Sequence, residues 1–253
     1  MLLLLRFLPF AVGVTNALLF AWQSRDASSY PWLIIWTPFT VLIAGFVIGW
    51  KRITFSELVE KLLPAALAVA ACGYGLLLVE GWWALSVIPL LAGGVSFLAL
   101  ELLFLLAYLP TRYPVNGLSH LNLTLVPPTV WLAQYTSVGL TVFVHASRVI
   151  PIFVMSAATA LLFWSTSHVE ASGAERGRWA ALGAWLGLQA GLMGAFLPVS
   201  LALQGGIAAL AIALALRSRR YEIAPRPSFR FMLTEVSAAS VLLLLLVATA
   251  RWA

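Results

Sequence analysis

The residue with the clearest potential for chemistry is Glu101, which stands inside the apolar sequence LLAGGVSFLALELLFLLAYL. A carboxylate within the hydrocarbon of a membrane costs on the order of 3 kcal/mol or more unless it is paired or protonated. We therefore expect Glu101 to face the protein interior, with Arg6, His145 or Arg148 as its partner. Two interpretations stay open: a carboxylate that binds substrate or relays protons, and a protonated or ion-paired structural acid.

His145 and Arg148 form a second candidate, because an imidazole and a guanidinium three residues apart can bind an anion such as a lipid phosphate. A structural pair at a membrane interface is the other interpretation. Together with Glu101, these two residues are the candidates for substrate binding or proton relay.

No constellation in the sequence indicates catalysis, a cofactor or a metal. Ser119 and His120 are adjacent, but a nucleophile–base pair needs spatial geometry, and no GxSxG motif accompanies them. The three histidines, which include His168, do not have the spacing of metal ligands. Cys72 is the only cysteine and Asp26 the only aspartate, so disulfides and paired aspartates for magnesium are excluded.

Glycines at four-residue spacing predict close helix packing. Gly183, Gly187 and Gly191 form a GxxxGxxxG series, and Gly45 and Gly49 form a shorter one. Such a flat face lets another helix backbone approach closely. The motif does not say whether that helix belongs to the same chain or to a second subunit.

Membrane helices must position these residues, because the composition fits a membrane protein with several spans and few other classes of protein. Hydrophobic residues make up 62% of the 253 residues and charged residues only 9%. The net charge of +6 comes mostly from arginines that flank apolar stretches, which indicates contact with lipid headgroups rather than with nucleic acid. The expected partners are membrane lipids and a protein partner or second copy.

The apolar stretches predict an all-α, polytopic integral membrane bundle that forms one domain over 1–253. The first stretch lacks a basic region and a clear cleavage site, so it is interpreted as a helix rather than a signal peptide. Residues 55–61 are expected to form a short surface helix, and 110–128 a surface loop or re-entrant segment. The nine predicted transmembrane spans are 2–22, 32–50, 62–79, 84–109, 129–146, 149–166, 179–196, 199–216 and 232–250.

Loop charge predicts the orientation. With the N-terminus in the cytoplasm, the cytoplasmic loops carry eleven basic residues and the opposite side three. This asymmetry follows the positive-inside rule and places the C-terminus outside. A prokaryotic inner membrane is the expected location.

Three functions are compatible with this sequence. The first is a non-catalytic integral membrane subunit or scaffold of a larger complex, favoured by the shortage of ionisable groups. The second is a transporter or channel for a lipidic or weakly polar solute, with Gln189 and Gln204 along a path and helix breaks at Gly93-Gly94 and Gly205-Gly206. The third is an intramembrane enzyme that acts on a lipid.

Overall fold

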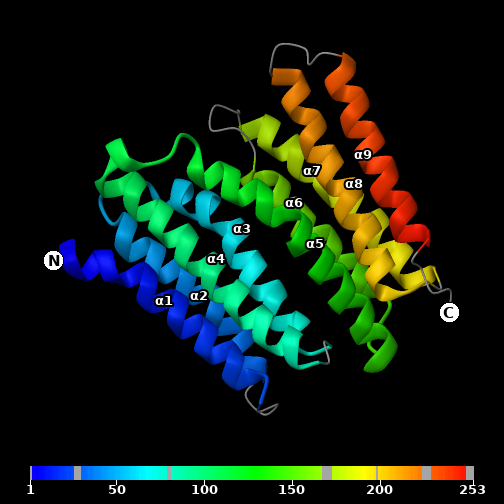
Figure 1. Cartoon of the computed structure of the whole chain (residues 1–253), viewed down its shortest axis with the longest axis horizontal. Coiled ribbons are helices and arrows are strands. Elements are labelled where there is room, and N and C mark those ends of the chain that lie inside the picture. The colour runs from blue at the N-terminus through cyan, green and yellow to red at the C-terminus, as the bar shows by residue number, and fades with distance from the viewer. Residues whose placement is uncertain are drawn as a thin grey trace. The chain divides into compact units, whose positions relative to one another are not determined.

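A computed structural model describes residues 2–25, 30–78, 81–166, 173–197, 199–223 and 229–248. In these residues the chain forms nine α-helices and one 3-10 turn, and no β-strand (Figure 1). The all-helical class is therefore confirmed. The elements are α1 (Leu2–Gln23), α2 (Tyr30–Gly49), α3 (Phe55–Gly75), α4 (Trp82–Tyr108), η2 (Pro110–Arg112), α5 (Gly117–Phe143), α6 (Val149–Ser165), α7 (Gly173–Phe196), α8 (Leu201–Ile223) and α9 (Phe229–Ala248).

Residue contacts divide the chain into two compact units. The first unit comprises Met1–Thr129 and Trp164–Ala171, and the second comprises Val130–Phe163 and Ser172–Ala253. The boundaries at 129/130 and 163/164 fall inside α5 and α6, so each of these helices contributes residues to both units. A single domain over 1–253 stays a prediction.

Three helical segments are long and apolar enough to cross a membrane, judged by length and composition over the described residues. They are Leu3–Gln23 in α1, Leu85–Tyr108 in α4 and Gly173–Phe196 in α7. Apolar stretches in α2, α6, α8 and α9 are shorter than about 18 residues. The helices therefore indicate a membrane protein.

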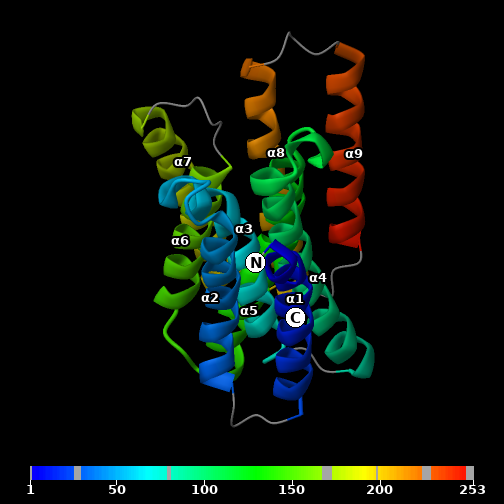
Figure 2. The same cartoon turned by 90° about the vertical axis from the view of Figure 1, so that its left-hand side faces the viewer.

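In the first unit, α1, α2, α3 and α4 lie side by side (Figures 1 and 2), and α1 packs on α4 while α2 packs on α3. Successive helices of this group run antiparallel (Figure 1). The start of α1, the end of α2, the start of α3 and the end of α4 therefore share one end of the unit. We call this the basic end, because it carries Lys51, Arg52 and Arg112.

The exposed face of α1 is unlike the exposed face of a helix in a water-soluble protein. Its outward face is apolar: Leu3 is 74% exposed, Phe7 62% and Leu18 65%. Its buried face combines the apolar residues Leu5 and Phe20 with the polar residues Asn16 and Gln23. A helix with large apolar side chains outside and amides inside fits a lipid surrounding, where the outer surface needs no hydration.

Residues 55–75 form one continuous helix. This corrects the expectation of a short surface helix over 55–61 followed by a separate span from 62. Thr54 caps the start of α3, where its hydroxyl accepts a hydrogen bond from the Glu57 N–H at 3.4 Å. The helix continues through Pro64 to Gly75. Leu58 and Leu62 are both buried against one side, so the same packing face runs through the expected boundary.

The second correction concerns 110–128, which was expected to be a loop or re-entrant segment. Residues 117–128 instead belong to α5, which runs through Pro127-Pro128 without ending. Leu118, Leu125 and Val126 are buried at helical spacing. This continuous apolar face outweighs the hydrogen bonds lost at the two prolines, whose turn-forming tendency suggested a loop.

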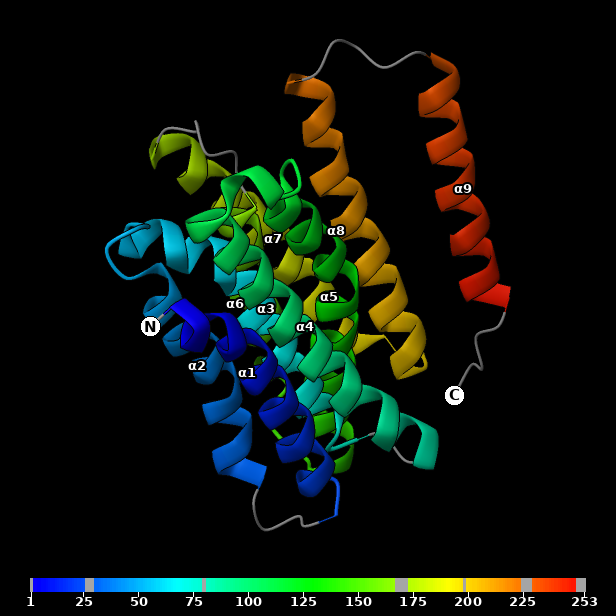
Figure 3. The same cartoon turned by 60° about the vertical axis from the view of Figure 1, so that its left-hand side comes forward.

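In the second unit, α8 packs on α7 on one side and on α9 on the other. Helices α8 and α9 lie antiparallel (Figure 3). Apart from Ala239, every α9 side chain that the structure describes is exposed, including Val236 at 62% and Leu244 at 67%. This helix therefore presents apolar residues around most of its circumference.

Candidate functional site

Glu101 is paired with Arg6, one of its three expected partners. The Arg6 Nη1 on α1 donates to the Glu101 Oε1 on α4 at 2.5 Å. The Glu101 side chain is 18% exposed and the Arg6 side chain 47%. Because the two charges neutralise each other, this ion pair joins α1 to α4 within the first unit.

Aromatic rings extend this pair along α4. The Arg6 guanidinium lies 5.2 Å from the centroid of the Phe104 ring, and Phe104 stacks on Tyr108 with centroids 5.1 Å apart. The Arg52 guanidinium in turn lies 5.4 Å from the Tyr108 ring. Cations are attracted to the face of an aromatic ring. The two arginines therefore lie at opposite ends of a stacked pair of rings toward the basic end.

An open hollow of about 430 Å³ adjoins the ion pair. Its walls are Phe7 and Phe10 of α1 and Phe97 of α4, together with Arg6 and Glu101 themselves. The hollow is thus lined mainly by phenyl rings, beside an ion pair whose two charges offset each other. No second acid or base lines this hollow, so the residues present do not make an acid–base pair for catalysis.

His145 and Arg148 belong to the second unit, in the segment that joins α5 to α6. His145 has a φ of 53°, in the left-handed region, and ends α5. Around it, the N–H groups of Val144 and Ala146 both donate to the Leu140 carbonyl, at 3.1 and 3.2 Å. His145 thus has an evident role in helix termination, and both His145 and Arg148 are exposed.

Ser119 and His120 occupy consecutive positions in the first turn of α5, and both are exposed. Consecutive helical residues point about 100° apart, so their side chains diverge. This geometry does not form a nucleophile–base dyad.

The glycine series on α7 packs against α6 of the same chain. A Cβ on Gly183 would lie 2.6 Å from the Thr159 carbonyl oxygen, and a Cβ on Gly191 would lie 2.7 Å from that of Pro151. At Gly187 a Cβ would collide with the backbone of Met155. Because the backbones are this close, the Thr159 hydroxyl reaches across and donates to the Gly183 carbonyl at 2.7 Å.

The shorter glycine pair lies between α2 and α3. A Cβ on Gly45 would collide with the Leu62 side chain, and one on Gly49 would lie 2.6 Å from Leu58 Cδ1. These two glycines therefore let α3 approach α2 within the first unit.

A buried polar network in the first unit was missed by the sequence reasoning. The Asn16 amide on α1 donates to the Ser96 hydroxyl on α4 at 2.9 Å, and its carbonyl accepts from the Thr40 hydroxyl on α2 at 3.0 Å. Asn16 and Ser96 are fully buried. An amide at the middle of an otherwise apolar span was the available signal, since such a group must find partners on neighbouring helices.

The expected helix breaks are absent, and this is a correction. Helix α4 is continuous through Gly93-Gly94 and α8 through Gly205-Gly206. At Gly93 a Cβ would lie 2.6 Å from the Gly13 carbonyl oxygen of α1, and Gly205 packs against Trp131 of α5. These glycines allow close approach between helices and do not interrupt them.

Two buried glutamines, Gln134 and Gln204, lie next to Gly194 in the second unit. Gln134 donates to the Ala190 carbonyl at 2.9 Å, and Gln204 donates to the carbonyls of Leu197 and Val199 at 2.9 and 3.1 Å. Their Oε1 atoms have no hydrogen-bond partner. The pair is thus a buried site with two free acceptors.

Among the described residues, no group of three His, Cys, Asp or Glu side chains comes together in a way that could hold a metal ion. Asp26 and His168 lie outside the described residues.

The fold and these sites define a helical bundle of membrane character. No family model matches the chain, and neither a curated protein nor a solved structure shows a significant similarity to it.

Proposed function

We propose that this protein is a non-catalytic integral membrane subunit or scaffold of a larger membrane complex. In this proposal its nine helices cross a prokaryotic inner membrane, with the N-terminus in the cytoplasm and the C-terminus outside. The observation that carries the proposal is the apolar outward face of α1, together with the burial of Asn16, which is hydrogen-bonded to two other helices.

The polar groups of the described interior mostly hold helices in place, which supports a structural role. The Asn16 network joins three helices, the Thr159 hydroxyl joins α6 to α7, and the Arg6–Glu101 pair joins α1 to α4. Groups engaged in this way are not free to bind a substrate. A protein that uses its few polar residues for packing is typical of a scaffold.

The exposed apolar surface of α9 supports the proposal that this protein has a protein partner. Its large apolar residues are exposed around most of the helix, from Leu233 at 56% to Leu245 at 56%. A helix that is apolar all round is stable when lipid or other helices surround it. We expect a protein partner or a second copy of the chain to cover part of this surface.

The test is native mass spectrometry of the full chain, purified in mild detergent and in nanodiscs. A partner protein or second copy at fixed stoichiometry, retained by the Glu101→Gln variant, is the expected result. A lone chain in both preparations would overturn the proposal. Val236→Ala together with Leu244→Ala, both on α9, should weaken the assembly, whereas Leu3→Ala together with Phe7→Ala on α1 serves as the control for lost apolar area.

Transport of a weakly polar solute is a second candidate, favoured by the free acceptor atoms of Gln134 and Gln204. Glycerol entry into proteoliposomes, followed by light scattering, tests it. Faster swelling than in empty liposomes, abolished by Gln134→Leu, would favour transport over the scaffold. An intramembrane lipid enzyme has less support, because Ser119 and His120 diverge.

A further inference from the structure

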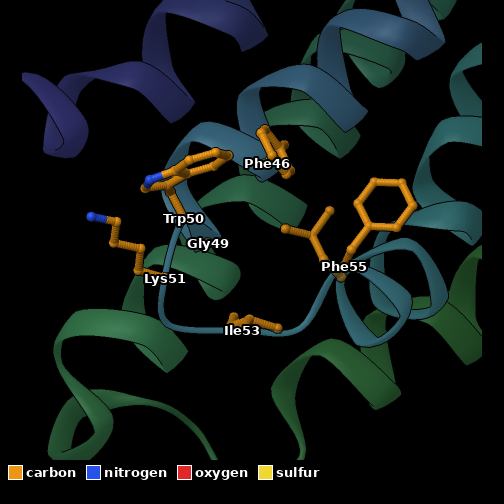
Figure 4. A pocket seen from close by; sticks show the side chains of 7 residues that line it. Phe46, Gly49, Trp50, Lys51, Ile53 and Phe55 are labelled. Atoms are coloured by element: carbon orange, nitrogen blue, oxygen red, sulfur yellow. The ribbon is translucent and has the colours of Figure 1, made fainter.

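The turn that joins α2 to α3 holds a hollow of about 200 Å³ at the basic end of the first unit (Figure 4). Its floor is apolar and buried, formed by Gly49 and Leu58, and its rim is exposed. The residues that line it are Phe46, Gly49, Trp50, Lys51, Ile53, Phe55 and Leu58.

Three aromatic rings make a fixed wall on this hollow. The Phe46 ring lies edge-on to Trp50, with centroids 4.7 Å apart, and edge-on to Phe55, with centroids 6.2 Å apart. Trp50 is nevertheless 54% exposed and Phe55 68%. Exposed aromatic residues at the end of an apolar helix are typical of the membrane–water interface, where ring and headgroup region meet.

Two exposed cations follow Trp50 directly in the chain. Lys51 lines the hollow, and its ammonium extends away from Phe55 in Figure 4. Arg52 is the next residue, and its exposed guanidinium lies over the Tyr108 ring, where it keeps its positive charge. Among the described residues, neither cation forms a salt bridge, and the nearby carboxylate of Glu57 is paired with Lys61 at 3.5 Å.

The turn presents these charges by a specific backbone conformation. Lys51 has a φ of 63°, which is uncommon for a side chain other than glycine. The N–H groups of Arg52 and Ile53 both donate to the Gly49 carbonyl, at 2.9 and 3.0 Å, so the turn is tied to the end of α2. The positive end of the α3 dipole, which starts at Phe55, adds to the same field.

We propose that this hollow binds an anionic phospholipid. The phosphate lies at Lys51 and Arg52, and the glycerol with the first part of an acyl chain lies against Phe46, Trp50 and Phe55. Charge complementarity selects the anionic headgroup, while the apolar floor and aromatic wall select a lipid over a soluble anion. This inference rests on the proposed membrane location and adds the class of lipid and its site.

The test measures the lipid that remains bound to the full chain after release from nanodiscs of phosphatidylcholine mixed with phosphatidylglycerol, by native mass spectrometry. The unaltered protein should retain phosphatidylglycerol in preference to phosphatidylcholine. Each basic residue near an anionic lipid surface contributes about fivefold in affinity, so Lys51→Gln with Arg52→Gln should lower this preference about 25-fold.

Matched variants separate the site from general charge effects. Arg25→Gln with Arg178→Gln removes two exposed cations elsewhere, on α7 in the case of Arg178, and should leave the preference unchanged. Lys51→Arg with Arg52→Lys keeps both charges and should also leave it unchanged, which guards against a fold defect. An unchanged preference in the Lys51→Gln, Arg52→Gln variant, or an equal loss in the Arg25→Gln, Arg178→Gln variant, would overturn the inference.

A further arm distinguishes the lipid from a free phosphate compound. Phe55→Ala removes part of the wall and should reduce phosphatidylglycerol retention, and soluble glycerol phosphate should not displace the lipid. Displacement by glycerol phosphate would show a soluble ligand and overturn the lipid assignment. Failure of the chain to insert into nanodiscs would refute the membrane proposal itself, whereas insertion with unselective retention would refute only this site.

Discussion

Single polar residues in this protein act mainly by joining helices. Asn16 bonds to Ser96 and Thr40 on two other helices, and all of these bonds lie at or near the buried interior. In lipid no water replaces a lost partner, so each such group stabilises one arrangement of the bundle. Glu101 contributes in the same way through Arg6.

At this scale we predict that Asn16→Leu, which keeps the branched shape of the side chain, destabilises the protein by about 1 kcal/mol, since two interhelical hydrogen bonds are lost and each contributes about 0.6 kcal/mol. Unfolding in mixed micelles with increasing dodecyl sulfate, followed by circular dichroism, measures this. Ser86→Ala is the control, because the exposed Ser86 hydroxyl donates only to the Trp82 carbonyl of its own helix. Equal effects of the two variants would contradict the role of the network.

Loss of Arg6 and loss of Glu101 should lower the free energy of unfolding by different amounts. Arg6→Gln leaves Glu101, 18% exposed, without its cation, whereas Glu101→Gln leaves Arg6 half-exposed and over Phe104. Because the pair is only partly buried, we expect Arg6→Gln to be the more destabilising by about 1 kcal/mol. The same unfolding assay, applied to both single variants and the double variant, tests this. A larger effect of Glu101→Gln would show that Arg6 depends on the pair more than Glu101 does.

At the scale of the helices, the main feature is the close approach of two helix backbones within a pair. Helices α1 and α4 meet at Gly13 and Gly93, and α6 and α7 meet along Gly183, Gly187 and Gly191. Each contact brings carbonyl oxygens to distances at which a Cβ would collide. Glycine is therefore required by the neighbouring helix and not by the conformation of its own.

Two adjacent glycines of α4 provide a sharp test. A Cβ at position 93 would lie 2.6 Å from the Gly13 carbonyl oxygen and 2.8 Å from Ala17 Cβ, while a Cβ at position 94 would have no atom within 4 Å. Gly93→Ala should destabilise by about 1–3 kcal/mol, because backbone must move. Gly94→Ala should be neutral or stabilising by up to about 1 kcal/mol through helix propensity. Thermal unfolding in detergent compares them, and similar midpoints would contradict the contact.

At the scale of the whole molecule, charge and apolar surface are arranged along the helix axes. The basic end of the first unit carries Lys51, Arg52 and Arg112. Arg25 follows the last residue of α1, at the opposite end of this unit. A helical bundle with this asymmetry is expected to be oriented with its basic end in the cytoplasm.

The proposed topology can be tested by labelling in cells. In a Cys72→Ala background, Ser56→Cys should react with a membrane-impermeant maleimide only after permeabilisation, and Ser147→Cys should react in intact cells. Both positions are exposed, and three proposed spans separate them. Labelling of both from the same side would mean that one of these helices, such as the polar α5, does not cross.

Much of this architecture is visible in the amino-acid sequence, because it depends on local patterns. Composition predicts an apolar helical protein, and the spacing of Thr54 and Glu57 predicts the cap at the start of α3, which the structure contains. Local patterns failed at 117–128, where turn-forming prolines suggested a loop but burial on one face maintains α5.

What the sequence by itself determined is the helical class, the apolar character and the uneven distribution of charge, since these follow from residue type and period. Only the tertiary structure decided that Glu101 pairs with Arg6, that Asn16 joins three helices, and that Lys51 borders an aromatic hollow. Those relations depend on the rotation and register of helices far apart in the chain. Packing of the whole unit sets these quantities, and no local pattern encodes them.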